Sequence, residues 1–218
     1  MVHMKTLPNR TGHQCGHATR QRGVVLFFAL IALVVMSLAA VALIRSVDTS
    51  TMIAGNLAFK QSATTSGDSG LEAAIVAMNA AQNAMKVAGK NVLMDPTNTL
   101  NITNAANGYY SNADPALNLT DSATWVDANS LLVGTDVTGN EIRYIIQRMC
   151  RDPDQVVSKN NCLFSAAALD NNGQSVPLPS DVCLGAGCPA AGQSPQYRIT
   201  SRIAGPANTV SYIQAFVY

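Results

Sequence analysis

The chain has 218 residues and a formal net charge of +1, a size that suits one globular domain beside a hydrophobic segment. Four basic residues and no acidic residue lie in the first 23 positions, which leaves ten basic against 13 acidic residues in the remainder. That remainder carries about −3 by this count and lacks the clustered Lys and Arg that a nucleic-acid-binding protein needs.

Histidine is confined to the same N-terminal stretch, at His3, His13 and His17. The rest of the chain therefore lacks the imidazole that Ser/His or Cys/His nucleophilic catalysis and histidine-bound metals require. It also contains no nucleophile elbow, phosphate-binding loop or metal-binding helix motif. We expect a protein that is not an enzyme and needs no cofactor or metal.

An apolar run from residue 24 to residue 44 contains 21 residues, of which only Ser37 is polar. As a helix rising 1.5 Å per residue, it would cross a hydrocarbon core of about 30 Å. Arg20 and Arg22 stand just before the run and Arg45 just after it. The basic residues on the N-terminal side favour a cytoplasmic location for residues 1–23 and export of the residues beyond the run.

Three kinds of protein segment begin with basic residues followed by an apolar run. An export signal has an apolar core of roughly 7 to 15 residues before a small-x-small cleavage site, and this run is longer, although Ala40-Val41-Ala42 fits such a site. An uncleaved single-span anchor fits the length. The third kind is processed where Gly23 meets the run, because a residue without a side chain lets extended backbone enter a tight protease site.

The boundary "RQRG" followed by "VVLFF" resembles the processing site of type IV prepilins. The resemblance implies that a membrane peptidase cleaves between Gly23 and Val24, that the new terminal amine is methylated, and that the helix survives. Phe28 occupies the fifth mature position, where major pilins carry Glu, and Arg45 occupies the twenty-second, where they often carry Pro. A buried ammonium without a carboxylate is costly, so the departures imply a minor pilin present in few copies.

Residues 45–90 are predicted to continue the helix. The stretch "SATTSGDSG" (62–70) is rich in helix-weakening residues, so we expect a kink or break there, with Asp68 or Ser69 as an alternative N-cap. A stripe with three- and four-residue steps then predicts a packing surface of Leu71, Ala74, Ile75, Met78, Ala81 and Met85.

Residues 95–140 are crowded with Asn, Asp, Thr and Pro and predict a loop region, anchored to the domain by Trp125, the only tryptophan. Alternating patterns predict strands in "EIRYIIQRM" (141–149), "QYRITSRIA" (196–204) and "TVSYIQAFVY" (209–218), the last two joined as a hairpin. One long helix followed by such strands indicates an α+β fold, with the helix packed on an antiparallel sheet.

The segments "AGNLAF" (54–59) and "YRITSRIAGPANTVSYIQAFVY" (197–218) resemble the PilX-type minor pilins of type IV pilus systems. The resemblance implies a pilin-like fold that divides into a cytoplasmic leader (1–23), a transmembrane half-helix (24–44), an amphipathic continuation (45–90) and a head outside the cytoplasm (91–218). It implies location in the inner membrane and then on the pilus of a Gram-negative bacterium. The implied partners are the prepilin peptidase, other minor pilins, the major pilin and a large tip adhesin.

The implied role is initiation of type IV pilus assembly at or near the filament tip. Two alternatives stay open. A type II secretion minor pseudopilin would share the leader and the missing glutamate at Phe28. An uncleaved single-span periplasmic scaffold or binding protein would share only the apolar run.

Four cysteines lie beyond the apolar run, and Cys15 precedes it. Outside the cytoplasm, four cysteines predict two disulfides. Local pairing closes the shortest loops and therefore favours Cys150 with Cys162 and Cys183 with Cys188. A zinc site at these cysteines, or a calcium site at Asp152 and Asp154, lacks the ligand spacing of known sites.

Overall fold

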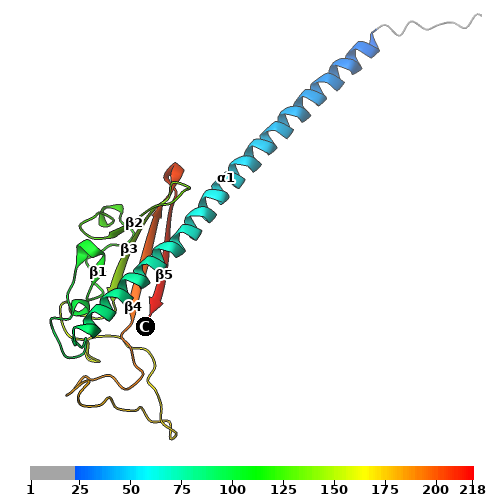
Figure 1. Ribbon diagram of the computed structural model, residues 1–218. Helices are drawn as coiled ribbons and strands as arrows, with labels where there is room; N and C mark the ends of the chain where they lie inside the picture. The colour runs from blue at the N-terminus through cyan, green and yellow to red at the C-terminus, as the bar shows by residue number, and fades with distance from the viewer. Residues whose placement is uncertain (1–22) are drawn as a thin grey trace, which may run out of the picture. The chain divides into compact units, whose positions relative to one another are not determined.

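The computed structural model describes residues 23–218, so the basic residues, histidines and Cys15 of the leader lie outside the described part. The chain falls into two compact units, residues up to Ile53 and Ala54–Tyr218. In the first unit, the described residues form the beginning of helix α1, which runs from Val24 to Val87, and every one of them is exposed. The second unit combines the remainder of α1 with a five-stranded sheet (Figure 1).

Helix α1 ends in a glycine cap. Gly89 adopts the left-handed conformation with φ +69°. Its N–H donates to the carbonyl of Lys86 at 3.1 Å, and the N–H of Lys90 donates to that of Met85 at 2.9 Å. These two bonds form the Schellman arrangement, which satisfies carbonyls that the helix end would otherwise leave unpaired.

The predicted break at residues 62–70 is wrong, because α1 is continuous through this stretch. Its small residues form a stripe, with steps of four, three and four positions, that faces the sheet. The buried members of the stripe are Ala63, Gly67, Gly70 and Ala74. A Cβ atom built on Gly70 would come within 2.8 Å of Ile142 Cγ2 and closer still to Ser201 Oγ. The glycines that weaken an isolated helix here allow close helix–sheet packing.

The sheet contains strands β1 to β5 in the order β1-β3-β4-β5, with β2 also paired to β3. Four short 3-10 turns, η1 to η4, lie in the connections. The strand bounds are Tyr109–Tyr110, Leu131–Thr135, Glu141–Arg148, Tyr197–Ala204 and Val210–Val217. The turns span Thr99–Asn101, Ala105–Asn107, Ser122–Thr124 and Pro206–Asn208. The predicted α+β layout is confirmed, and so is the hairpin of β4 and β5.

The sheet is mixed rather than antiparallel throughout. Strand β1 pairs with β3 in parallel, with Tyr109 opposite Ile146, whereas the other pairings are antiparallel. Both β1 and β2 lie in the region predicted as loop. Two residues are too few to show an alternating pattern, and β2 is irregular between Leu132 and Gly134, so neither strand is apparent from periodicity.

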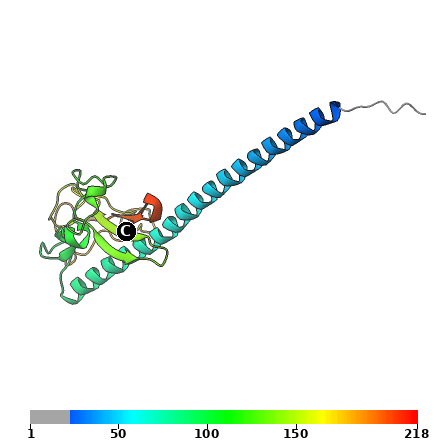
Figure 2. The same ribbon diagram turned by 90° about the horizontal axis from the view of Figure 1, so that it is seen from above.

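The core lies on both faces of β3. On the inner face, Tyr144, Ile146 and Ile199 pack against the predicted apolar stripe of α1, and five of its six residues take part. On the outer face, Ile145 is covered by Tyr110 and by Trp125, which is 4% exposed, confirming its predicted role as an anchor. Viewed from above, the connecting segments gather on the side of the sheet away from α1 (Figure 2).

Two matched glycine substitutions test the close packing. A Cβ atom at Gly55 would meet nothing within 4 Å, so Gly55→Ala should stabilise the protein by up to about 1 kcal/mol through helix propensity. Gly70→Ala makes the same propensity change but forces a side chain against the sheet, and should destabilise by about 1–3 kcal/mol. Urea denaturation of the full chain in detergent, followed by Trp125 fluorescence, measures both. Equal effects of the two substitutions would contradict the packing argument.

Candidate functional site

The residues expected at the processing site stand at the beginning of α1. Gly23 directly precedes the first helical residue, Val24, and a Cβ atom at Gly23 would meet nothing within 4 Å. Phe28 is four positions after Val24 and therefore lies on the same helix face; its side chain is 64% exposed. From Gly23 to Ile44 the sequence contains no ionisable side chain. The part of α1 that begins here is long and apolar enough to cross a membrane.

Beyond the run, further apolar side chains are exposed among polar ones. Val47, Met52 and Ile53 in the first unit are all more than half exposed, and so is Leu57 in the second. Soluble monomers rarely expose contiguous apolar patches of more than a few hundred Å². This part of α1 therefore has the surface of a segment that is covered in its working state.

The four cysteines of the head form two disulfides, Cys150–Cys162 and Cys183–Cys188. Cys150 and Cys162 pack with Val157 in a small core just beyond the end of β3. The second bond closes a six-residue ring in which Leu184 is 76% exposed. Across residues 23–218, no three His, Cys, Asp or Glu side chains gather as a group that could hold a metal ion.

Arg148, the last residue of β3, is fully buried and holds two chain segments against the sheet. Its Nε donates to the carbonyl of Ser111 at 2.9 Å. Nη1 donates to the carbonyl of Leu100 at 2.8 Å and to Oδ1 of Asn101 at 2.6 Å. Nη2 donates to the carbonyl of Gln155 at 2.7 Å. The Arg148 guanidinium thus supplies hydrogen-bond donors to loop carbonyls that are not paired within a strand or a helix.

Asp154 extends this network to the surface. It has a left-handed φ of 55°, and its Oδ1 accepts the N–H of Thr103 at 2.7 Å and the hydroxyl of Ser111 at 3.1 Å. The bond from the Thr103 backbone is the main cause of a lowered pKa for the Asp154 carboxyl. Oδ1 of Asp154 is therefore bonded to two protein donors from the chain segment 103–111.

A second polar network joins α1 to the turn between β2 and β3. Asp136 Oδ1 accepts the N–H groups of Thr138 at 2.8 Å and Asn140 at 2.9 Å. Its Oδ2 accepts the Ser66 hydroxyl and, at 2.9 Å, the amide of Asn140, which also donates to Ser62 Oγ at 3.1 Å. The Ser66 bond is the largest cause of a strongly lowered pKa at Asp136. The turn is therefore attached to the helix through one ionised carboxylate.

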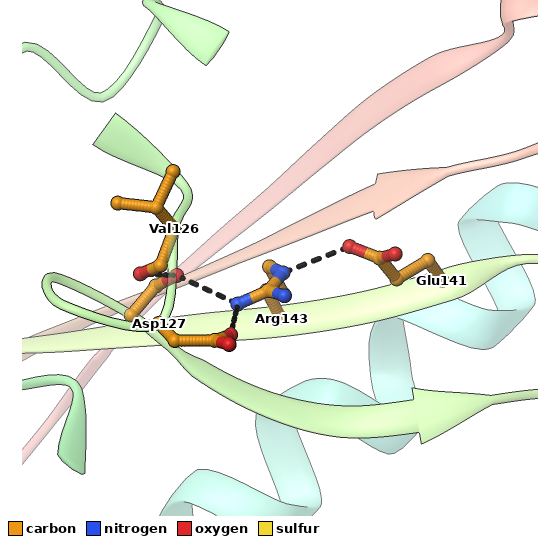
Figure 3. A network of polar contacts seen from close by, with 5 residues as sticks. Val126, Asp127, Glu141 and Arg143 are labelled. Atoms are coloured by element: carbon orange, nitrogen blue, oxygen red, sulfur yellow. Dashed lines mark hydrogen bonds and ion pairs between the residues drawn. The ribbon is translucent and has the colours of Figure 1, made fainter. Parts of the chain in front are cut away.

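On the outer face, Arg143 fixes the loop that carries Trp125. It pairs with Asp127 and Glu141, each at 2.8 Å (Figure 3). Because the Asp127 side chain is 87% exposed, this pair contributes at most about 1 kcal/mol. Beyond it, the Trp125 ring lies 6.0 Å from that of Tyr212 on β5, so the loop reaches across β4.

No protein-family model, curated protein or solved structure matches this chain. The structure brings the paired cysteines together and places Gly23, Val24 and Phe28 at one helix end. Sequence reasoning did not identify Gly70, Asp136 or Arg148. The sequence "DVTGN" does indicate a turn, since Asp and Asn side chains bond to nearby backbone in turns. By contrast, nothing in "EIRYIIQR" distinguishes a buried arginine from an exposed one.

Replacing Arg148 should unfold the head more readily. Arg148→Met leaves the carbonyls of Leu100, Ser111 and Gln155 without this donor, and should lower the free energy of unfolding by about 3 kcal/mol or more. Arg151→Met, at an exposed position three residues further along the chain, is the matched control and should change stability little. Urea denaturation followed by Trp125 fluorescence gives both values, and a loss at Arg148 no larger than at Arg151 would contradict the role assigned to the guanidinium.

The Asp136 turn should make stability depend on pH. Because the folded pKa of Asp136 is lowered, its contribution is present above the ordinary value of about 3.9 and is lost as the pH falls through the folded pKa. Asp136→Asn should therefore be less stable than the wild type at pH 7. The difference should shrink as the pH is lowered from 5 towards 3 in urea denaturation. A difference that stays constant over this range would exclude the ionised carboxylate as its source.

Proposed function

We propose that the chain is a minor pilin that takes part in initiating a type IV pilus, at or near the filament tip. The observation that carries the proposal is the position of Gly23, directly before α1, between a basic leader and an apolar helix. Cleavage after Gly23 would keep the whole of α1, whereas an export-signal cut after Ala42 would remove its first 19 residues.

The continuity of α1 supports the proposal. One helix of 64 residues contains both the exposed apolar run and the stripe that packs against the sheet of the head. A subunit of this kind is held by its apolar run in the inner membrane before assembly. Inside a filament, the same surface packs against the helices of neighbouring subunits, other minor pilins and the major pilin.

The presence of Phe28 at the fifth mature position supports a role in which each filament contains few copies of the protein. After cleavage, the amine of Val24 would be the only charge between the new N-terminus and Arg45. An ammonium in an apolar fibre core is costly unless a carboxylate lies near it, and this chain offers none there. The cost is tolerable once, at a tip or in an initiating complex, but not in every subunit of a fibre.

The head acts in this proposal as a binding and structural unit rather than an enzyme. Its polar residues are used in holding loops to the sheet, as Arg148, Asp136 and Arg143 do. Two disulfides strengthen the segments beyond β3, which suits a domain that works outside the cytoplasm, where a large tip adhesin would be a further partner.

Gly23→Val tests the proposal, because a bulky β-branched residue should block entry to the peptidase. In cells with a prepilin peptidase, the wild-type protein should begin at a methylated Val24 by mass spectrometry, and the variant should keep residues 1–23. Gly16→Val, also within the leader, is the control and should be processed normally. The strain with the uncleaved variant should lose pili and twitching motility but not protein secretion.

Three results would contradict the proposal. A wild-type protein that begins at Leu43 is an exported protein with a removed signal. One that keeps its leader where the peptidase is active is a permanent anchor. Loss of secretion with normal pili assigns the chain to a type II secretion system instead.

A further inference from the structure

Strand β5 forms an edge of the sheet that lacks the usual protection against pairing with another chain. Among the strands of residues 23–218, it pairs only with β4, in an unbroken eight-residue register. The opposite edge of the sheet offers a poorer template for an added strand, because β1 has only two residues and β2 is irregular between Leu132 and Gly134. Edge strands in soluble proteins are usually short, bulged, charged or interrupted by Pro. The segment from Val210 to Tyr218 has none of these features and contains no charged side chain.

The side chains of β5 alternate in exposure along the whole strand. Ser211, Ile213, Ala215 and Val217 point towards α1 and are partly buried. The outer face instead presents an aromatic stripe interrupted by Gln214, with Tyr212 41% and Phe216 57% exposed. An open backbone edge beside alternating apolar side chains is what an added β-strand recognises: the main chain supplies hydrogen bonds and the stripe selects side chains.

Charge on the neighbouring strand indicates which strand fits. Arg202 stands opposite Tyr212, and directly opposite Arg143 on its other side. Arg143 has two carboxylate partners, whereas Arg202 forms no ion pair with any residue from 23 to 218, and its Nε is buried without a hydrogen-bond partner there. An added strand would lie about 10 Å from β4, two strand spacings away, which an arginine and a glutamate side chain span together.

We propose that β5 binds an extended segment of a different polypeptide as a sixth strand, with apolar residues against Tyr212 and Phe216 and a carboxylate near Arg202. A second copy that paired through its own β5 would bring no acidic side chain to Arg202 from that strand, because β5 carries none. The inference concerns the head alone and does not rest on the proposed function. Blocked processing at Gly23 would leave the β5 edge unchanged.

The test uses the full chain in detergent and a synthetic ten-residue peptide labelled with fluorescein. The peptide alternates threonine with valine and tyrosine and carries one glutamate on the apolar face. Its binding is measured by fluorescence anisotropy. Two altered peptides accompany it: one has glutamine in place of glutamate, and one is N-methylated at alternate residues, which keeps its side chains but removes the donors for strand pairing.

The original peptide should bind and the N-methylated peptide should not. Phe216→Lys should weaken binding about tenfold or more, because it places a charge on the edge and removes an aromatic contact. Val137→Lys is the matched control, since it adds the same charge at an exposed position in the turn between β2 and β3, and should leave binding unchanged. Arg202→Gln should weaken binding of the glutamate peptide by about two- to fivefold. Its affinity should then equal that of the glutamine peptide.

Several outcomes would overturn the proposal: no binding, equal binding of the N-methylated peptide, or equal loss in Phe216→Lys and Val137→Lys. A dimer of the full chain that Phe216→Lys dissociates would show that a second copy occupies the edge. Trp125 fluorescence checks that each variant is folded, and because Phe216 is largely exposed, its replacement by Lys should not disturb the core.

Discussion

The close approach of α1 to the sheet is the constraint on which the head depends. Ala63, Gly67, Gly70 and Ala74 present almost no side-chain bulk, so the helix backbone comes within contact of Ile142, Ile203 and Ile213. Each glycine costs about 1 kcal/mol of helix propensity relative to alanine. Packing offsets this, because a larger residue would push the helix away and expose the apolar inner face of β3 and β4.

Two polar networks add to the stability that this packing provides. At one end of β3, the Asp136 turn bonds to Ser62 and Ser66 of α1 directly or through Asn140. At the other end, Arg148 reaches under the loops and satisfies carbonyls that no strand or helix pairs. Buried polar groups are costly when unpaired, so a network of this kind stabilises one loop arrangement against others. Irregular segments on both sides of β3 in the sequence are therefore bonded to it through side chains.

The molecule exposes two kinds of apolar surface, and each suits a different kind of partner. The first unit exposes side chains all around a helix, which suits lipid or other helices. Strand β5 exposes a single stripe beside open main chain, which suits one extended segment. If both surfaces are used together, the chain joins a helical assembly through one unit and holds a further polypeptide through the other.

How far the sequence predicts this protein depends on the range of the interactions. The apolar run, the boundary at Gly23, the stripe from Leu71 to Ala81 and strands β3 to β5 all arise from patterns within a few residues of one another. Such local periodicity determines which face of an element is apolar, and so it determined the α+β class. The processing hypothesis also rests on sequence alone, because it concerns the order of charge, glycine and apolar residues.

Tertiary structure decided the rest, since it depends on residues far apart in the chain. The glycines at 67 and 70 weaken a helix when read locally, and only the presence of the sheet turns them into a packing surface. The parallel pairing of β1, the burial of Arg148 and the bond between Ser66 and Asp136 join segments tens of residues apart. Local propensity contains no information on such partners, because their free energy appears only when the chain has brought them into contact.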